Sequence, residues 1–253
     1  MPRIGLIGYG NIGHFLVNRL PGIQWIYRRV ALQPSSLPFI HAPDQLTEVD
    51  LVILAVPDQA IKPVSHQLSQ SLPIETAIVH TSGTTSWSEL DPYFTDRGVL
   101  YPLMTIRDGI TPVHGNFPWL IEGNSTAFTE RISQWGKEWE LITQAMKTND
   151  REKIHLAAVL VNNFTNHLYD LAAQWTAKNH LDFQLLLPLL QETSEKLTNN
   201  QPVMAQTGPA RRGDLSTIRR HLTLLASDPD KRLVYEVLTA SILKQFHATT
   251  DDH

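Results

Sequence analysis

Residues 4–13 read IGLIGYGNIG, a short apolar run followed by three spaced glycines. Gly8, Gly10 and Gly13 form the pattern G-x-G-x-x-G between a predicted strand and a predicted helix, NIGHFLVNRL. There the first glycine permits a tight turn, the second lets the backbone approach a pyrophosphate, and the third allows close packing of helix on strand. The alternative is a glycine-rich turn that binds no ligand. The residues expected to hold a dinucleotide, partly through the free N–H groups of the helix N-terminus, are Gly8, Tyr9, Gly10, Asn11, Ile12 and Gly13.

Further apolar runs predict a doubly wound, mostly parallel sheet. Residues 22–29 predict a second strand, which completes a βαβ unit. Residues 51–58 and 75–83 are continuous apolar runs, as expected for parallel strands that are covered on both faces. Additional strands are expected at 98–103, 117–123 and 140–143, with a helix at 125–136.

The strand pattern then stops, and helical spacing takes over. Residues 149–178 carry apolar residues three and four apart and predict one long helix, followed by helices at 183–200, 214–227 and 230–246. We therefore predict an α/β protein. It would have a Rossmann-type NAD(P)-binding domain at 1–148 and an all-α helical domain for substrate binding and dimerisation at 149–253.

Composition narrows the possible partners. A net charge of −4 over 253 residues offers no general attraction to nucleic acid or to an anionic membrane surface, so we expect neither as a partner. The absence of cysteine excludes disulfides and thiolate catalysis. No apolar stretch has the length of a membrane span, and the N-terminus does not resemble a signal peptide. These features predict a cytoplasmic enzyme with a small-molecule substrate.

The end of the second predicted strand indicates which cofactor is preferred. NAD-preferring folds place an acid there, whereas this chain has Arg28 and Arg29 and no Asp or Glu before residue 44. Guanidinium groups attract a 2′-phosphate and bind it through paired N–H donors, so NADP(H) is favoured. Two solvated arginines are the alternative. Val56, Pro57 and Asp58 are expected to line the ribose and nicotinamide side, since ligands bind at the carboxyl ends of such strands.

Several strings together resemble a known family. They are GYGNIG, LAVPD, HTSG at 80–83, YPLMT at 101–105, HLAAVLVNNFTNHLYDLA at 155–172 and TGPARRGD at 207–214. The chain resembles bacterial Rossmann-like proteins with a C-terminal domain of unknown function 2520. These proteins fall within the 6-phosphogluconate dehydrogenase-like superfamily, which also includes pyrroline-5-carboxylate reductase. The resemblance implies this fold, NADP binding and dimerisation through the helical half, but no particular substrate.

Hydride transfer also needs a group that exchanges a proton with the substrate. His155 lies near the start of the long predicted helix, and Asn162 and Asn166 follow on about the same helical face. Related dehydrogenases place a lysine and an asparagine one turn apart on the corresponding helix, and this sequence has neither that lysine nor that spacing. A structural histidine at position 155 is the alternative.

The HTSG segment supplies further candidates. Ser82 could hydrogen-bond a substrate carbonyl or carboxylate, and His80 could orient the substrate or act as the alternative acid. Residues 81–86 are also typical of a turn and a helix cap. No metal-binding or acyl-enzyme motif occurs, so neither a metal ion nor an acyl-enzyme is expected.

The segment TGPARRGD at 207–214 interrupts the helical half with two adjacent cations. Asp214 is suited to cap the helix that follows. We expect Thr207, Arg211 and Arg212 to bind an anionic substrate, since the corresponding loop of pyrroline-5-carboxylate reductases holds the substrate carboxylate. The alternative is an ion pair that only braces two helices.

Two classes of function remain open. The first is an NADP(H)-dependent oxidoreductase that acts on a small, anionic carbonyl or imine compound. The second is an NADP(H)-binding sensor or regulatory protein without catalysis. A homodimer is expected in either case, because helix 149–178 carries more apolar surface than a four-helix half can cover, unless those residues form an internal core. They are Leu156, Val159, Leu160, Leu168, Leu171 and Trp175.

Overall fold

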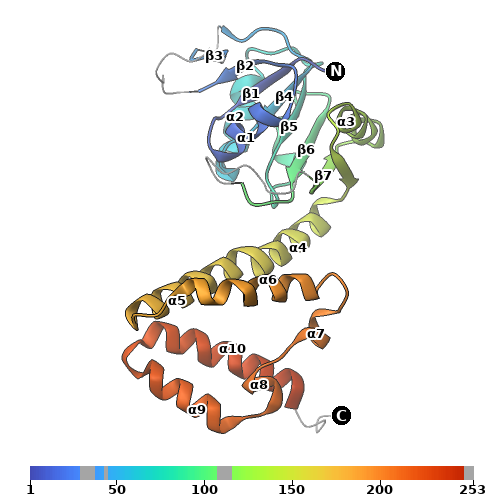
Figure 1. The fold of residues 1–253 in the computed structure, drawn as a ribbon. Helices are drawn as coiled ribbons and strands as arrows, with labels where there is room; N and C mark the ends of the chain where they lie inside the picture. The colour runs from blue at the N-terminus through green and yellow to red at the C-terminus, as the bar shows by residue number, and fades with distance from the viewer. Residues whose placement is uncertain (29–37, 43–44, 107–115, 248–253) are drawn as a thin grey trace. The chain divides into compact units, whose positions relative to one another are not determined.

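The computed structural model describes residues 1–28, 38–42, 45–106 and 116–247. The chain forms two compact units, Met1–Phe164 and Thr165–His253, which we call the first and the second unit. The first unit contains a β-sheet with helices, and the described part of the second unit consists of helices and the loops between them (Figure 1). The division of the chain into domains at residue 148 stays a prediction.

The first unit is built on a sheet that has eight strands among the described residues, in the order β3-β2-β1-β4-β5-β6-β7-β8. Neighbouring strands are parallel except β6 and β7, which are antiparallel. The chain order reverses direction between β1 and β4, which is where doubly wound sheets bind ligands. The strands are β1 (Ile4–Ile7), β2 (Ile23–Tyr27), β3 (Phe39–Ile40), β4 (Leu51–Leu54), β5 (Ala77–His80), β6 (Arg97–Pro102), β7 (Pro118–Gly123) and β8 (Ile142–Ala145).

Helices cover both faces of this sheet. The two cores separate by alternation along each strand: in β4, Leu51 and Ile53 join the core under α1 and α3, while Val52 and Leu54 join the core under α2. Burial on both faces explains why the strands read as continuous apolar runs. The helices are α1 (Asn11–Arg19), α2 (Asp58–Leu68), η2 (Trp87–Glu89), α3 (Thr126–Glu138), α4 (Thr148–Ala158) and the π-helix η3 (Val159–Phe164).

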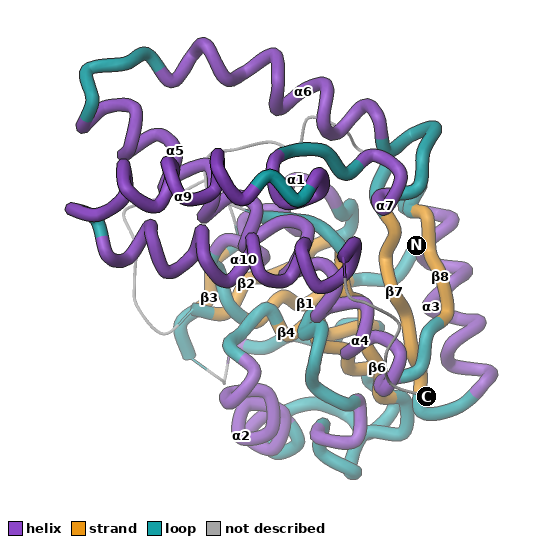
Figure 2. Tube along the Cα trace, turned by 90° about the horizontal axis from the view of Figure 1, so that it is seen from below, coloured by secondary structure: helices purple, strands orange, loops and turns teal. Residues whose placement is uncertain are grey.

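The described part of the second unit contains helices and loops but no strand (Figure 2). No helix within the described residues is long and apolar enough to cross a membrane. The helices are α5 (Thr165–Lys178), η4 (Phe183–Leu186), α6 (Leu187–Lys196), α7 (Pro202–Ala205), α8 (Pro209–Arg212), α9 (Leu215–Leu224), η5 (Leu225–Ser227) and α10 (Pro229–His247).

The predicted fold class is confirmed, with three local differences. Strand β3 was not predicted, because two residues are too short to show a period. The antiparallel pairing of β6 with β7 was not predicted either, since an apolar run carries no direction. The expected helix at 149–178 is helical throughout, but it changes from α4 to the π-helix η3 and back to α5. Such π-segments often occur at functional sites.

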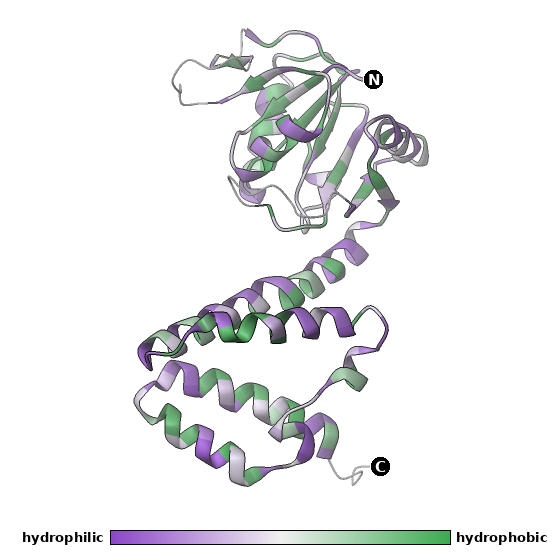
Figure 3. Cartoon of the chain, viewed as in Figure 1, coloured by the Kyte–Doolittle hydropathy of each residue, from purple (hydrophilic) through white to green (hydrophobic). Residues whose placement is uncertain are grey.

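The second unit buries few apolar side chains of its own. Ala210 and Ile218 are the only buried apolar residues among its described residues. Figure 3 shows apolar segments along α6, α9 and α10. Large exposed side chains among them include Leu189, Leu224, Leu233, Val237 and Leu238.

Candidate functional site

The glycine loop after β1 has the geometry of a backbone cradle. Gly8 has φ +95°, and a Cβ there would lie 2.3 Å from the carbonyl oxygen of Ala55, so only glycine fits. A Cβ on Gly13 would lie 2.3 Å from the carbonyl oxygen of Gly8, which explains the close packing of α1. A Cβ on Gly10 would meet nothing within 4 Å, and no side chain caps the N-terminus of α1. Open space and free N–H groups together fit a bound pyrophosphate.

A pocket of about 340 Å³ lies on one side of this loop, at the carboxyl ends of β1, β2 and β4. Gly8, Arg28, Val56 and Pro57 line it, as do apolar residues of α2 that include Ala60 and Val64. Four residues predicted to bind the cofactor thus lie together. Arg29, predicted as the second cation, lies outside the described residues.

Two other predicted cofactor residues lie beside this pocket without lining it. The ring of Tyr9 makes edge contacts with the rings of Phe39 and His14, each at 4.9 Å between centroids. The carboxylate of Asp58 accepts a hydrogen bond from the hydroxyl of Thr84 at 2.8 Å. Asp58 therefore joins the start of α2 to the loop after β5, and this geometry favours a structural function for it.

A second pocket, of about 680 Å³, is lined by Ile12 of the glycine loop and by residues that follow β6. Helix α4 and the π-helix contribute His155 and Asn162 to it. The hydroxyl of Tyr101 and Nδ1 of His155 are 2.9 Å apart, which is hydrogen-bonding distance. Burial raises the pKa of Tyr101, and the nearby Arg151 guanidinium partly offsets this rise. Tyr101 therefore stays protonated at neutral pH and can donate a proton.

Asn162 of η3 contacts the segment that follows β6. Its amide nitrogen donates a hydrogen bond to the hydroxyl of Thr105, which leaves its carbonyl oxygen able to accept one from a ligand. Asn166, expected on the same face, is an exposed residue of α5 and belongs to the second unit, so its place in the site stays a prediction.

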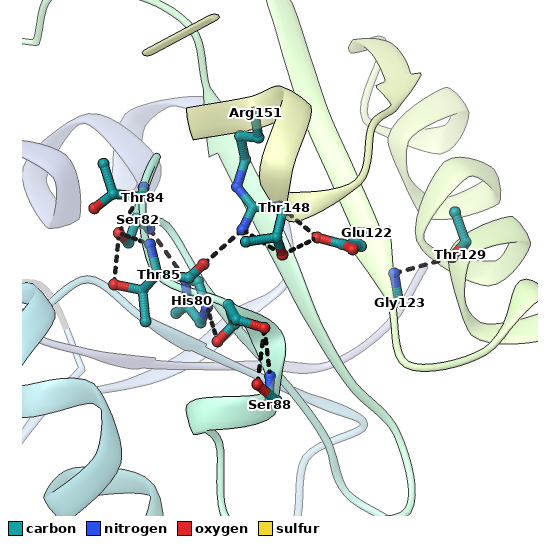
Figure 4. Close-up of polar contacts among 11 residues, drawn as sticks. His80, Ser82, Thr84, Thr85, Ser88, Glu122, Gly123, Thr129, Thr148 and Arg151 are labelled. Atoms are coloured by element: carbon teal, nitrogen blue, oxygen red, sulfur yellow. Dashed lines mark hydrogen bonds and ion pairs between the residues drawn. The ribbon is translucent and has the colours of Figure 1, made fainter. Parts of the chain in front are cut away.

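The predicted catalytic residues of the HTSG segment have other partners (Figure 4). His80 is fully buried: its Nδ1 accepts from the backbone N–H of Ser82 at 3.2 Å, and its Nε2 lies 3.3 Å from the carbonyl oxygen of Ser86. Burial lowers the pKa of His80 to about 4, so the ring is neutral. A neutral, enclosed imidazole holds the loop together, and this geometry does not favour the prediction that it acts as an acid.

Ser82 is likewise used within its own loop. Its hydroxyl accepts from the backbone N–H groups of Thr84 and Thr85 and donates to the hydroxyl of Thr85 at 2.9 Å. This is the turn-and-cap alternative. The segment contacts the second pocket through Gly83 instead, where a Cβ would lie 2.6 Å from Nδ1 of His155 and 2.9 Å from the ring of Tyr101.

The same close-up shows a buried ion pair between α4 and β7 (Figure 4). The Arg151 side chain is 0% exposed, and its Nη1 lies 2.6 Å from a carboxylate oxygen of Glu122. Its Nη2 donates to the carbonyl oxygen of Thr85 at 2.5 Å. Arg151 therefore connects α4 both to β7 and to the loop after β5.

In the second unit, the segment 207–214 forms α8 between two glycines with positive φ, Gly208 and Gly213. The Arg211 guanidinium lies over the Phe246 ring at 4.1 Å from its centroid. Within the described residues, neither Arg211 nor Arg212 forms an ion pair, so the brace through an acidic side chain is not observed there. Asp214 accepts from the backbone N–H of Thr217 at 3.0 Å and caps α9, as predicted.

Sequence reasoning missed two groups in the first unit. Tyr101 stands near the carboxyl end of a predicted strand, and applying the carboxyl-end rule to that strand would have indicated it. Arg151 and Glu122 carry no such signal, because nothing in the sequence distinguishes a buried arginine from an exposed one. Among the described residues, no group of three or more His, Asp or Glu side chains is placed to hold a metal ion.

This fold and these pockets define a Rossmann-like dinucleotide-binding protein with a helical C-terminal unit. Residues 117–242 match the family described as domain of unknown function 2520, so the chain carries this domain. The domain of unknown function 2520 that the sequence led us to expect is thereby confirmed in this segment. A comparison with curated protein sequences finds no match.

Solved structures resemble the chain over nearly its whole length. A provisionally assigned NADP oxidoreductase from Bacteroides fragilis is 29% identical with a TM-score of 0.82, covering 95% of this chain and 97% of its own. A protein from Thermotoga maritima is 19% identical with a TM-score of 0.71, covering 96% and 97%. A Plasmodium falciparum pyrroline carboxylate reductase with NADP bound is 14% identical with a TM-score of 0.63, covering 98% and 97%. The last two similarities concern the fold alone.

Proposed function

We propose that the protein is an NADP(H)-dependent oxidoreductase that transfers a hydride to or from a small carbonyl or imine compound. The observation that carries this proposal is the pair of pockets flanking one glycine loop. The pocket with Gly8 and Arg28 suits the adenosine half of a dinucleotide, and the pocket with Ile12, Tyr101 and His155 suits the nicotinamide half and a substrate. The similarity to the Bacteroides fragilis protein supports the same class of activity.

Arg28 is our candidate for recognising the 2′-phosphate, with Arg29 next to it in sequence. The described residues of the adenosine pocket include no acid that would repel a phosphate and accept a ribose hydroxyl. A charge-assisted contact to phosphate contributes about 1.5 to 3 kcal/mol, which corresponds to roughly a tenfold to hundredfold change in affinity.

Tyr101 and His155 are our candidates for proton transfer. When bound, the cofactor supplies or accepts the hydride at the reacting carbon. In the reducing direction, the phenol of Tyr101 donates its proton to the substrate oxygen or nitrogen, and His155 returns a proton to the phenolate. Asn162 lines the same pocket, and its carbonyl oxygen is our candidate for orienting a hydrogen-bond donor of the substrate.

The lining of the second pocket contains no Lys or Arg among the described residues. For the second unit, we propose that Arg212, with Thr207, binds an anionic ligand. Arg211 is the less suitable candidate, since its guanidinium already packs on Phe246. An Arg212→Gln change should lose binding of carboxylate or phosphate ligands at an unchanged Tm, whereas Arg211→Gln should lower the Tm. Normal ligand binding by Arg212→Gln would contradict this assignment.

Cofactor titration tests the main proposal. We expect wild-type protein to bind NADPH more tightly than NADH, and Arg28→Ala, alone or with Arg29→Ala, to lose most of this preference. Arg3→Ala is the matched control, because Arg3 pairs with Asp50 at the start of β1 rather than at its carboxyl end. Equal dissociation constants for the two cofactors in the wild type would reject the NADP assignment.

Turnover distinguishes an enzyme from a sensor. With a panel of small aldehydes, keto acids and cyclic imines, NADPH oxidation should be detectable and should fall at least tenfold in Tyr101→Phe. Tight NADPH binding by the wild type without turnover of any of these compounds would favour the non-catalytic sensor.

A further inference from the structure

The buried Arg151 cluster is not used by the reaction proposed above. Its guanidinium makes contacts with three parts of the first unit: Glu122 on β7, the carbonyl oxygen of Thr85 after β5, and the hydroxyl of Thr148 at 3.2 Å (Figure 4). Thr148 in turn donates to the same Glu122 oxygen at 2.7 Å. Helix α4 is thus fixed at its first turn by a closed set of polar contacts.

Stability alone does not explain this cluster. Removing two charges from water costs several kcal/mol per ion, so a buried ion pair is often no more stable than an apolar pair of similar volume. The Nε atom of Arg151 is also buried without a hydrogen-bond partner in the described structure. What a planar guanidinium provides is a fork of donors in fixed directions, which sets the geometry of everything bound to it.

The fork holds both elements that enclose the Tyr101–His155 pair. His155 lies one turn after Arg151 on α4, so fixing Arg151 fixes the position of the imidazole along the sheet. Thr85 belongs to the same turn as Gly83, whose backbone packs against His155 and Tyr101. A shift of either element would change the 2.9 Å distance between Tyr101 and His155.

We propose that Arg151, held by Glu122, is a positioning residue that fixes His155 against Tyr101. Its catalytic meaning rests on the proposed function, but the hydrogen bond that it positions can be measured without turnover. The measurable quantity is the coupling between the two side chains, which is the change in the ¹⁵N chemical shift of His155 Nδ1 when Tyr101 loses its hydroxyl.

The test is the NMR spectrum of ¹⁵N-labelled histidine, recorded at one pH, in four proteins: wild type, Tyr101→Phe, Arg151→Lys and the double variant. We expect Tyr101→Phe to change the ¹⁵N chemical shift of His155 Nδ1 in the wild-type background, because this nitrogen loses its hydrogen-bonding partner. In the Arg151→Lys background the same substitution should change it by much less, because lysine keeps the charge beside Glu122 but not the fork that reaches Thr85. A His155→Asn variant assigns the signal.

Two further variants keep the test decisive. Arg131→Lys is the control, since Arg131 of α3 forms an ion pair with Asp96, which directly precedes β6 in the same unit, and should leave the coupling unchanged. If Arg151→Lys does not fold, Glu122→Gln with Arg151→Met removes both charges together and should also lose the coupling. An undiminished coupling in either Arg151 background would overturn the proposal, and so would the failure of both to fold.

This outcome is separable from the proposed function. If the coupling depends on Arg151 but Tyr101→Phe leaves turnover unchanged, the positioning stands and the proton-transfer assignment fails. If turnover requires Tyr101 while the coupling is the same in every background, the enzyme proposal stands and Arg151 is only structural.

Discussion

The two units of the chain bury their apolar side chains to very different extents. In the first unit both faces of the sheet are covered, and residues such as Leu6, Ile53 and Phe128 are at most 1% exposed. In the second unit only Ala210 and Ile218 are buried apolar residues among those described, while Leu224 is 64% and Leu233 61% exposed. The difference teaches that the first unit has a core of its own, whereas the described part of the second unit leaves a large apolar surface exposed.

The same contrast applies to polar groups. The first unit buries Arg151 and His80 completely, so their hydrogen bonds act in a medium where electrostatic interactions are strong. The charged groups of the second unit, such as Asp214 and Arg232, lie near its surface. We therefore expect precise chemistry to depend on the first unit and assembly to depend on the second.

The largest effect should come from charging the apolar surface of the second unit. We propose a homodimer through its helices, where α5, α9 and α10 line a groove of about 430 Å³ that includes Trp175, Leu224 and Leu238. Light scattering of the wild type at micromolar concentration should give a dimer. Leu224→Glu with Leu238→Glu should give a monomer, because a dimer would bury carboxylates without partners. Its Tm should be lower, because the folded chain loses the stabilisation that association supplies.

A control in the first unit makes this result specific. Ile74 is 44% exposed, the same fraction as Leu238, and Ile74→Glu should leave both the mass and the Tm unchanged. A monomeric wild type would contradict the proposed homodimer, and the exposed leucines of the second unit would then need another explanation.

A smaller effect is expected from acid in the first unit. The folded-state pKa of His80 is lowered from 6.5 to about 4, so the unfolded chain binds its proton first as the pH falls. Stability from this group is therefore present above pH 6.5 and is lost progressively down to about pH 4. At about 1.4 kcal/mol per pKa unit, the loss is about 3 kcal/mol.

Urea unfolding at a series of pH values measures this loss. Tryptophan fluorescence reports mainly the first unit, which holds Trp25, Trp87, Trp119, Trp135 and Trp139, against Trp175 in the second. His80→Gln should flatten the pH dependence between pH 6.5 and 4, because an amide can make similar hydrogen bonds without titrating. An equal slope in wild type and variant would mean that another group is responsible.

Sequence reasoning could predict the sheet because its signals are local. The run LVIL at 51–54 is apolar on both faces, and the glycines at 8, 10 and 13 belong to a pattern whose geometry is set by the backbone. The strand β3 and the direction of β7 could not be predicted, since pairing depends on residues far apart in the sequence.

The candidate site was predictable only in part. His155 was singled out as a titratable group on a helix, but its neighbour Tyr101 is 54 residues away and meets it only in the folded chain. His80 and Ser82 were chosen for their chemical types, yet each is occupied by hydrogen bonds within residues 80–86. A residue type indicates what chemistry is possible, whereas burial and bonding partners determine which of it remains available.

The smallest effect should be a local one at the cap of α9 in the second unit. The pKa of Asp214 is lowered to about 2, first because its carboxylate accepts the backbone N–H of Thr217, and then because it accepts the hydroxyls of Thr217 and Ser216. Since the folded-state value lies below the ordinary 3.8, the stabilisation is present above pH 3.8 and is lost as the pH falls through about 2.

Asp214→Ala should speed hydrogen exchange of the Thr217 amide several-fold at neutral pH, whereas Asp214→Asn should keep the cap and remove its acid sensitivity. Asp182→Ala, at the cap of η4 in the same unit, should leave that amide unchanged. If Asp214→Ala also changed the tryptophan signal of the first unit, the two units would not be energetically independent, and the contrast drawn between them would fail.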